Sequence, residues 1–585
     1  MATVVRAWQL LSRNDQLLLF LLAVVVGIAA GYGALAFRAL TAGIQLLFLG
    51  HTSELVASSA ALLPWWQVLA APTAGGLLIG LFIFKLMPGR RPHGVADVIE
   101  AGALRNGRMS LNVGLGAALT SAASIGCGAS VGREGPIVHL GATLAAYVAQ
   151  RLHLSPSLAR TLLGCGVAAA IASAFNAPIA GVFFALEVVV GHYGLGAFSP
   201  VVISSVIGTV ITRIHIGPDA AFAMPHHGVT SFWELPAFVL LGLVSALAAL
   251  ALMRAIALVQ AVHDRLGTPS WLRPALAGLA VGAIALPFPE VLGVGYEVTD
   301  LALRDAYGLQ LLILLALAKG AATAISLGSG FAGGIFSPSL VLGALVGGAF
   351  GHVAGTALPD YGSSPGVYAI LGMGAVAACI LGAPISTVIM IFELTLNYGV
   401  TFALMVAVAV ASVTSRQIWP HSFFTWQLAG RGVNLLGRRE QALLRGASVA
   451  SVMRRQVVTV GLAATLDELK GLFVQRHLPI FVTDDAGRLV GTISFADLAD
   501  AAFDPERSGA EITARDLVHR LPIALTPEDD LETALRLCEL NDEEHMPVVD
   551  DGRDLHVIGE VRRADLVLAY NRALLAARRI ERGES

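Results

Sequence analysis

The chain has 585 residues, of which 56% are hydrophobic and only 14% are charged. Its mean hydropathy of +0.73 excludes an ordinary soluble globule and indicates a protein that crosses a lipid bilayer many times. The formal net charge of −3 argues against a nucleic-acid partner. The cysteines lack metal-ligand spacing, so we interpret them as small packing residues: Cys127, Cys165, Cys379 and Cys538.

Six apolar segments are long enough, or nearly long enough, to span a bilayer. They are 17–49, 65–87, 197–212, 235–262, 309–327 and 401–413. Between them lie shorter, Gly-rich runs: 111–131, 137–150, 161–174, 178–190, 337–356, 366–381 and 384–396. Many of these runs are too short to cross, so we expect tilted or partial helices buried in the protein.

The distribution of Arg and Lys predicts the orientation. Arg6 and Arg13 precede the first segment, residues 51–64 contain neither residue type, and 85–91 is basic again. Because basic residues concentrate in cytoplasmic loops, we expect a cytoplasmic N-terminus and an external 51–64 loop. The Arg-containing stretch 416–439 predicts that the membrane part also ends in the cytoplasm.

One apolar region is interrupted by Gly132-Arg133-Glu134-Gly135-Pro136. Ionisable groups at membrane depth are costly and usually mark an ion pathway. Glycines let a backbone approach a ligand closely, and Pro136 suits the first turn of a helix whose free N–H groups bind anions. We therefore predict a broken helix that presents its positive end, with the Glu134 carboxylate at the anion position. The alternative is a kinked structural helix in which Glu134 pairs with Arg133.

The interrupted region occurs twice. Residues 124–136 align without gaps on 326–338, an offset of 202 (338 − 136). Further pairs follow at drifting offsets: Gly164 with Gly372, Gly166 with Gly374, Ala177-Pro178 with Ala383-Pro384, and Glu187 with Glu393. Interrupted apolar segments at corresponding places in two halves indicate a transporter binding site.

The two segments 132–136 and 334–338 resemble the GREGP and GxFxP signatures of CLC chloride channels and proton/chloride antiporters. The resemblance covers about residues 17–430. It implies an all-α polytopic membrane domain of about eighteen helices in two inverted repeats, assembled as a homodimer with one anion path per subunit. It also implies that chloride, and other small anions, are transported, with protons if transport is coupled.

The same resemblance implies a protein of the plasma (inner) membrane with both termini cytoplasmic, no enzymatic activity and no required cofactor. Glu134 corresponds to the external gating glutamate, which fills the anion site when ionised and swings away when protonated. The backbone N–H groups of Ile335 and Phe336 correspond to the central anion site, where dipoles hold an anion without a full charge. The outer half of the path would be shaped by Gly132, Arg133 and Gly135.

Two customary side-chain donors of the central site are replaced. In Pro92-His93-Gly94-Val95-Ala96-Asp97, His93 stands where a serine hydroxyl usually faces the anion. In Ser422-Phe423-Phe424, Phe424 stands where a tyrosine hydroxyl usually lies. We expect a site of altered strength or selectivity, in which protonation of His93 tightens chloride binding. The alternative is that His93 turns aside, donates to a backbone carbonyl and only packs.

Three further positions bear on coupling and electrostatics. Antiporters often carry a second, internal proton-relaying glutamate where this chain has Val188, and some exchangers lack it. Glu187 is interpreted mainly as structural, because it has the counterpart Glu393, with a substitute relay as the alternative. Lys319 either attracts anions or is a satisfied structural lysine. The sequence favours a gated, passive chloride channel, with proton-coupled chloride exchange as the alternative.

The composition changes near residue 430. We expect a polar, Arg-rich linker over 431–448 and then an α/β pattern that occurs twice, over 449–505 and 512–572, with a frayed helical tail over 573–585. The two α/β segments resemble a tandem pair of CBS domains.

Gly491, Ser494 and Asp497 fit the CBS pattern in which a hydroxyl and a carboxylate hold a nucleotide ribose. The second copy has Arg562 at the hydroxyl position, so one site looks intact for an adenine nucleotide. The alternative is a purely structural pair. A third class of function, a membrane-anchored nucleotide sensor that no longer transports, is disfavoured by the intact signature residues Gly132, Glu134 and Pro338.

Overall fold

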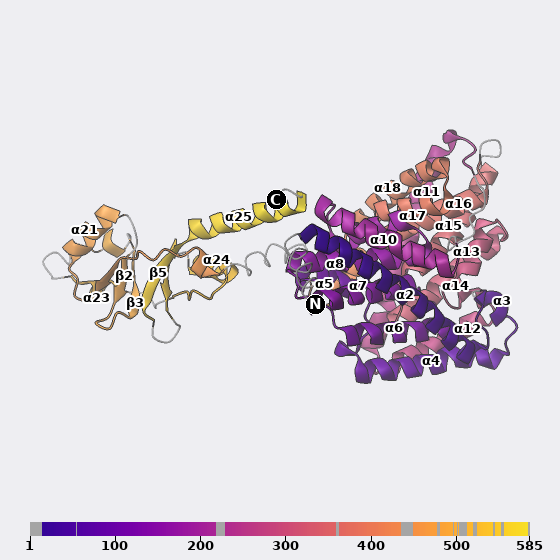
Figure 1. Cartoon of the computed structure of the whole chain (residues 1–585), viewed down its shortest axis with the longest axis horizontal. Helices are drawn as coiled ribbons and strands as arrows, with labels where there is room; N and C mark the ends of the chain where they lie inside the picture. The colour runs from indigo at the N-terminus through magenta and orange to yellow at the C-terminus, as the bar shows by residue number, and fades with distance from the viewer. Residues whose placement is uncertain are drawn as a thin grey trace, which may run out of the picture. The chain divides into compact units, whose positions relative to one another are not determined.

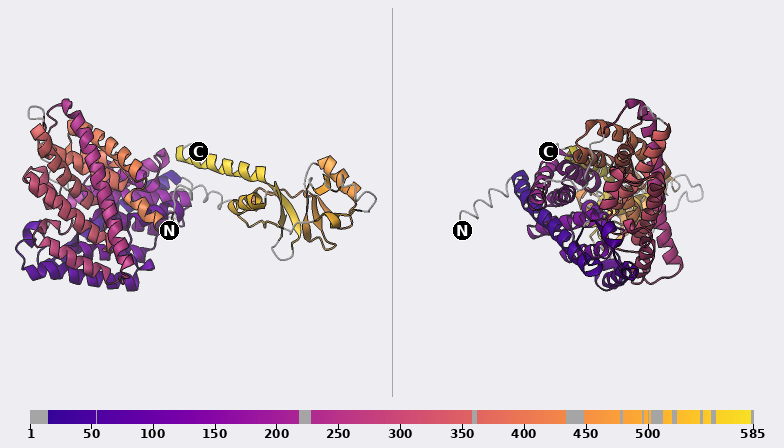
Figure 2. Two further views of the ribbon diagram at one scale, coloured as in Figure 1. Left: turned by 180° about the vertical axis from the view of Figure 1, so that it is seen from behind. Right: turned by 90° about the vertical axis from the view of Figure 1, so that its right-hand side faces the viewer.

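The computed structural model describes residues 15–53, 55–217, 228–357, 362–433, 448–476, 480–494, 497–499, 501, 512–518, 523–541, 544–550 and 555–582. Its contacts divide the chain into two units, Met1–Val433 and Asn434–Ser585. The first unit is helical and the second combines helices with small sheets (Figure 1; Figure 2). Most of the expected 431–448 linker lies outside the described residues.

The described part of the first unit contains the helices α2 to α19. Their bounds are α2 (Asp15–Leu49), α3 (Val56–Ala60), α4 (Trp65–Leu86), α5 (Val95–Leu104), α6 (Leu111–Gly126), α7 (Glu134–Arg151), α8 (Pro156–Phe175), α9 (Pro178–Phe184), α10 (Leu195–His215), α11 (Leu235–Arg265), α12 (Arg273–Ala285), α13 (Tyr296–Leu303), α14 (Leu309–Gly328), α15 (Phe336–Ala357), α16 (Pro365–Leu381), α17 (Pro384–Thr395), α18 (Tyr398–Ile418) and α19 (Phe423–Ala429). Short 3₁₀ turns occupy 88–90, 232–234 and 289–291, and a π-helical turn continues α9 over Ala185–Val190.

Eight of the described helices are long and apolar enough to cross a membrane, which confirms the predicted polytopic helical domain. Two of them, α8 and α15, coincide with the Gly-rich runs 161–174 and 337–356, which were not among the six segments expected to span the membrane. The helix α8 starts before its apolar run because Ser155 caps its N-terminus and Pro156 occupies its first turn. Polar capping residues of this kind lengthen a helix beyond the segment that hydropathy detects.

Reciprocal hydrogen bonds relate the two halves. The Ser124 hydroxyl accepts from the Ala332 N–H (3.1 Å), and the Ser326 hydroxyl accepts from the Ser130 N–H (3.2 Å). Each bond maps onto the other through the offset of 202 (326 − 124 and 332 − 130). The sequence repeat is therefore also a repeat of structure.

Paired glycines bring the same helices of each half into close contact. A Cβ on Gly141 would lie 2.4 Å from the Gly166 carbonyl oxygen, where α7 crosses α8. A Cβ on Gly343 would lie 2.4 Å from the Gly372 carbonyl oxygen, where α15 crosses α16. Because no side chain fits at these crossings, glycine is required at both.

These crossings correct the register that the sequence suggested. Gly166 corresponds to Gly372, an offset of 206 (372 − 166), and not to Gly374. The left-handed residues that end α8 and α16, Asn176 (φ 58°) and Gly382 (φ 69°), are also 206 apart (382 − 176). The alignment by glycine identity failed because both helices carry a Gly-x-Gly sequence, and either glycine could be matched to either.

The second unit contains two α/β repeats. Strands β1 (Thr459–Gly461), β2 (Ile480–Thr483) and β3 (Leu489–Ile493) form a sheet in that order, with β1 parallel and β3 antiparallel to β2. Strands β4 (His545–Val549) and β5 (Val557–Arg562) pair antiparallel. The helices are α21 (Leu466–Arg476), α23 (Ala514–Leu517), α24 (Leu531–Asn541) and α25 (Arg563–Arg582). This confirms the expected α/β repeats, although the first strand begins two residues later than the run Val457–Val460 suggested.

Each repeat of the second unit has its own core. Ile480, Val482 and Ile493 pack in the first core. Met546, Val548 and Val561 pack in the second. A smaller cluster joins the repeats through Phe481, Leu489 and Val549, which are all buried. The expected tail from residue 573 continues the helix α25 as far as Arg582.

Candidate functional site

The two interrupted segments lie against each other. The Gly132 N–H donates to the Gly334 carbonyl (2.7 Å), and the Gly334 N–H donates to the Gly132 carbonyl (2.8 Å). A Cβ on Gly135 would lie 2.9 Å from the Gly334 Cα, so the two loops meet this closely because both lack side chains there. Helices α7 and α15 start directly after these loops. Two positive helix ends therefore meet at one buried place, which is a favourable position for an anion.

The carboxylate of Glu134, the first residue of α7, is fully buried (0% exposed). Its Oε1 accepts a hydrogen bond from the Tyr296 hydroxyl at 2.6 Å, and its Oε2 accepts one from the Ser337 hydroxyl. The Arg133 Nε is 4.0 Å from Oε1, and the Arg133 guanidinium lies over the Tyr296 ring at 4.4 Å. Two hydroxyls, rather than an ion pair with Arg133, thus make the short contacts to the carboxylate.

Gly132 is where the carboxylate approaches the backbone. A Cβ on Gly132 would lie 3.0 Å from Glu134 Oε2 and 3.0 Å from the Ser337 backbone nitrogen. The carboxylate therefore rests beside the first turn of α15, whose N–H groups have no partner within the helix. The buried Glu134 carboxylate therefore lies where two helix N-termini meet.

Ile335 and Phe336 are buried at the start of α15, as the sequence suggested. The Phe336 ring packs between Phe175 and Phe184, with ring centroids 5.1 and 5.7 Å away. This packing fixes the first turn of α15 and is compatible with a role of the backbone N–H groups. Phe424, in α19, is also buried and contacts Phe423, and it offers no hydroxyl.

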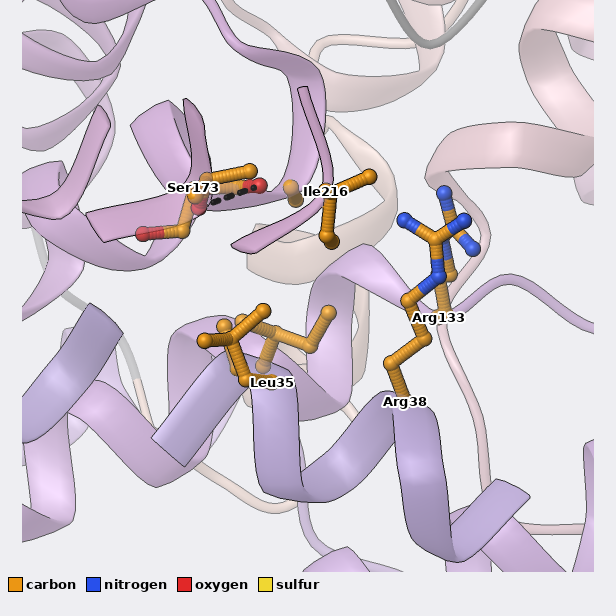
Figure 3. A pocket seen from close by; sticks show the side chains of 9 residues that line it. Leu35, Arg38, Arg133, Ser173 and Ile216 are labelled. Carbon is orange, nitrogen blue, oxygen red and sulfur yellow. Dashed lines mark hydrogen bonds between the residues drawn. The ribbon is translucent and has the colours of Figure 1, made fainter. Parts of the chain in front are cut away.

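Arg133, next to Glu134 in the chain, lines a small pocket. Figure 3 shows the guanidinium groups of Arg38 and Arg133 at the same end of it, with Leu35, Ser173 and Ile216 around the rest. Two cationic groups at the wall of a cavity raise the local concentration of anions. Arg133 thus lines this pocket and also lies 4.0 Å from the Glu134 carboxylate.

His93 is turned toward protein partners. Its Nε2 lies 3.1 Å from the Pro88 carbonyl oxygen, and its Nδ1 lies 3.2 Å from Asp97 Oδ1. Asp97 also accepts from Arg91 and Arg431. Both ring nitrogens therefore face acceptors of the chain, and these contacts favour the alternative in which His93 donates to a backbone carbonyl and packs.

Tyr296 was not anticipated from the sequence. It begins α13 directly after Gly295, which adopts a left-handed φ of 93°. Behind this turn the buried Lys319 donates from Nζ to the carbonyls of Val291 and Gly293, at 2.9 Å each. Lys319 thus makes the contacts of a satisfied structural lysine and secures the loop that presents Tyr296.

The repeat is the signal that could have found Tyr296. Gly94 precedes α5 as Gly295 precedes α13, so Tyr296 corresponds to Val95, an offset of 201 (296 − 95). Val95 lies beside Gly135, since a Cβ on that glycine would be 3.7 Å from Val95 Cγ2. By the same symmetry, the start of α13 should lie beside the second signature. Ser337 stands inside that signature but was not distinguished from its neighbours.

Glu187 and Glu393 each cap the N-terminus of a helix in the other half of the repeat. The Glu187 carboxylate accepts from the Ile385 and Ser386 N–H groups at 3.2 and 2.8 Å, at the start of α17. The Glu393 carboxylate accepts from the Ile179 and Ala180 N–H groups at 2.9 and 2.7 Å, at the start of α9. These reciprocal contacts favour the structural interpretation of Glu187.

In the second unit, Ser494 and Asp497 are close together. The Ser494 hydroxyl donates to Asp497 Oδ2 at 2.7 Å, and the Ser494 N–H donates to the same oxygen at 2.8 Å. Gly491 is buried in β3, opposite Val482. The hydroxyl and the carboxylate thus stand together at the end of β3, as the nucleotide interpretation requires, and they also make the contacts of a helix-capping pair.

The equivalent place in the second repeat is occupied by the chain's own charges. Asp565, the counterpart of Asp497, accepts from Arg454 at 2.8 and 3.2 Å. Arg562 donates to Glu560. Burial would raise the pKa of Glu560, but neighbouring His545 and Arg562 outweigh it and lower that pKa. In the second repeat, the position that corresponds to Ser494 and Asp497 is therefore filled by the pairs Arg454–Asp565 and Arg562–Glu560.

Comparison with known proteins agrees with the two-unit architecture. A profile of the family described as "Voltage gated chloride channel" matches residues 75–416, and the CBS domain profile matches residues 449–504 and 514–572. A ClcB-like chloride channel protein of Ralstonia nicotianae is 38% identical over 412 residues, covering 69% of this chain and 95% of that protein. The chloride channel protein CLC-e of Arabidopsis thaliana is 29% identical over 583 residues, covering 88% of this chain and 81% of that protein.

Solved structures share the fold. A slow cyanobacterial Cl⁻/H⁺ antiporter superposes with a TM-score of 0.63 at 24% identity, covering 71% of this chain and 97% of that one. A eukaryotic CLC transporter superposes with a TM-score of 0.60 at 19% identity, covering 94% of this chain and 97% of that one.

Proposed function

Because this chain belongs to the CLC family of voltage-gated chloride channels, we propose that it carries chloride through a path gated by the Glu134 carboxylate. The observation that supports this most is the position of that carboxylate, buried at the meeting point of two helix N-termini. A carboxylate held there is a tethered competitor of the transported anion.

The contacts explain how such a gate would work. While ionised, Glu134 accepts from Tyr296 and Ser337 and excludes a second negative charge from the site. Protonation removes the charge and weakens both hydrogen bonds, because bonds to a charged acceptor are about twice as strong as neutral ones. The side chain can then leave, and an anion takes its place on the N–H groups of Ile335 and Phe336.

We further propose that conduction is passive. Val188 cannot relay a proton, and the adjacent Glu187 is held by the start of α17. Proton-coupled chloride exchange is the second candidate, because the structural neighbours include a Cl⁻/H⁺ antiporter and a fluoride/proton antiporter.

The family and the distribution of Arg and Lys support a proposal for the assembly and the orientation. We propose a homodimer in the plasma (inner) membrane, with both termini cytoplasmic and one anion path per subunit. The C-terminal repeats, over 449–505 and 512–572, would regulate the path by binding a nucleotide.

The test measures chloride and proton movement together on purified protein in liposomes. Wild-type chloride flux should rise as the external pH falls, with little uphill proton movement. In Glu134→Ala the flux should be high and insensitive to external pH, because the titrating competitor is gone.

Glu234 provides a matched control. It is also fully buried and accepts from a tyrosine and a serine hydroxyl, those of Tyr368 and Ser363, at 2.8 Å each. Glu234→Gln should keep the acid activation of the wild type. An unchanged pH profile in Glu134→Ala would refute the gate, and proton pumping at a fixed ratio would establish exchange.

A further inference from the structure

The donors around Glu134 are side chains as well as backbone. Tyr296 from α13 and Ser337 from α15 each give one hydroxyl to one carboxylate oxygen. The two positions at which hydroxyls were expected, 93 and 424, provide none, since His93 is bound to Pro88 and Asp97 and Phe424 has no polar atom. Tyr296 and Ser337 thus place two hydroxyls at Glu134, whereas positions 93 and 424 provide none.

The backbone and ring of Tyr296 are held in place by contacts that do not involve Glu134. The left-handed Gly295 sets the direction of the chain, Lys319 binds the carbonyls of the preceding loop, and Arg133 covers the ring. Tyr296 would therefore keep its position when the carboxylate leaves. A donor that remains in place is preorganised for the next anion.

We infer that the hydroxyls of Tyr296 and Ser337 are direct ligands of the transported anion, and that the Glu134 carboxylate and chloride compete for these two donors. This inference rests on the proposed chloride transport. It assigns two specificity-determining residues to the path and predicts that they have opposite effects on gating and on binding. They hold the gate closed, and they hold the anion once the gate is open.

The ionisable groups described around the carboxylate come from its own loop and from α13 and α14. Arg133 lies on its own loop at 4.0 Å, and Tyr296 lies on α13. Lys319 on α14 lies behind Gly295, since a Cβ on that glycine would be 3.2 Å from its Nζ. Replacing either hydroxyl leaves Arg133 and Lys319 unchanged, so its effect can be separated from that of the surrounding charge.

The binding test uses the purified full-length Glu134→Ala protein, in which the site is open, titrated with sodium chloride in a calorimeter. Adding Tyr296→Phe or Ser337→Ala should weaken chloride binding about tenfold each, the effect of one hydrogen bond to a charged acceptor. Tyr368→Phe and Ser363→Ala remove the equivalent hydroxyls from Glu234 and should change chloride affinity less than about twofold.

The gating test uses proteins that retain Glu134. Tyr296→Phe and Ser337→Ala should each activate at a less acidic external pH than the wild type, because the closed carboxylate has lost a donor. Each replacement removes one oxygen atom and adds no bulk, and size-exclusion elution identifies any variant that misfolds.

Chloride affinity that is unchanged by both replacements in the Glu134→Ala background would overturn the inference, even if the gating shift is seen. In that case the hydroxyls would serve the carboxylate alone. Failure of the proposed function gives a different result, because a wild-type protein without chloride flux contradicts transport whatever the calorimeter records.

Discussion

Single residues of the path differ in how far the sequence identified them. Glu134 and its glycine neighbours were found because a charge and several glycines interrupt an apolar run, which is a local signal. Tyr296 and Ser337 lie 162 and 203 residues away from Glu134, and although Ser337 stands inside the second signature, nothing local to either residue links it to that carboxylate. Their contact with Glu134 depends on the loop pairing of Gly132 with Gly334, which only the folded chain provides.

His93 gives a prediction at this scale. Since Pro88 and Asp97 occupy its ring nitrogens, chloride affinity in a Glu134→Ala background should vary less than about threefold between about pH 5.5 and 8, the range around the ordinary histidine pKa. His93→Ser should leave the affinity profile equally flat. Calorimetry with chloride checks both proteins.

A steep rise of affinity toward acidic pH, abolished by His93→Ser, would contradict this expectation. It would show that His93 leaves Asp97 when an anion is bound. The linkage between protonation of His93 and chloride binding would then hold.

The sequence predicted the helices themselves more reliably than the register that relates a helix of the first half to its counterpart in the second. The long apolar helices followed from hydropathy, and the repeat followed from the gapless alignment of 124–136 on 326–338. The register of α8 against α16 was wrong by two residues, because glycine identity does not say which glycine faces the neighbouring helix. The crossings at Gly166 and Gly372 decide it.

The reciprocal caps give a prediction about elements. Glu187→Gln and Glu393→Gln should each destabilise the membrane unit by about 1–3 kcal/mol, since each weakens charged hydrogen bonds to a helix start. The two variants should melt at similar temperatures. Neither should alter the ratio of proton to chloride movement.

Each of these variants is the control for the other, because each carboxylate accepts two backbone N–H groups at a helix start, although Glu187 also accepts from the Ser386 hydroxyl. If Glu187→Gln alone abolishes proton movement while Glu393→Gln does not, Glu187 is a substitute proton relay. The purely structural role would then be wrong, and the chain would be an exchanger.

At the scale of the whole molecule, the composition and two signatures predicted the helical membrane unit, and the change in composition with the repeated α/β pattern predicted the unit that follows it. The sequence predicted only in part which of the two CBS repeats has its nucleotide position occupied by the chain's own charged side chains. Arg562 marked the second copy as altered, but the pairing of Asp565 with Arg454 depends on contacts between segments 111 residues apart.

We therefore predict that the full-length protein binds one adenine nucleotide, at Ser494 and Asp497. Calorimetry with ATP, ADP or AMP should show one site per chain that Asp497→Ala removes, because the ribose loses its carboxylate acceptor. Asp565→Ala is the matched control in the second repeat. It should leave the affinity within about twofold, because Arg454 already occupies that carboxylate. Binding that survives Asp497→Ala but not Asp565→Ala would move the site to the second repeat, and no heat with any of the three nucleotides would leave Ser494 and Asp497 as a helix cap alone.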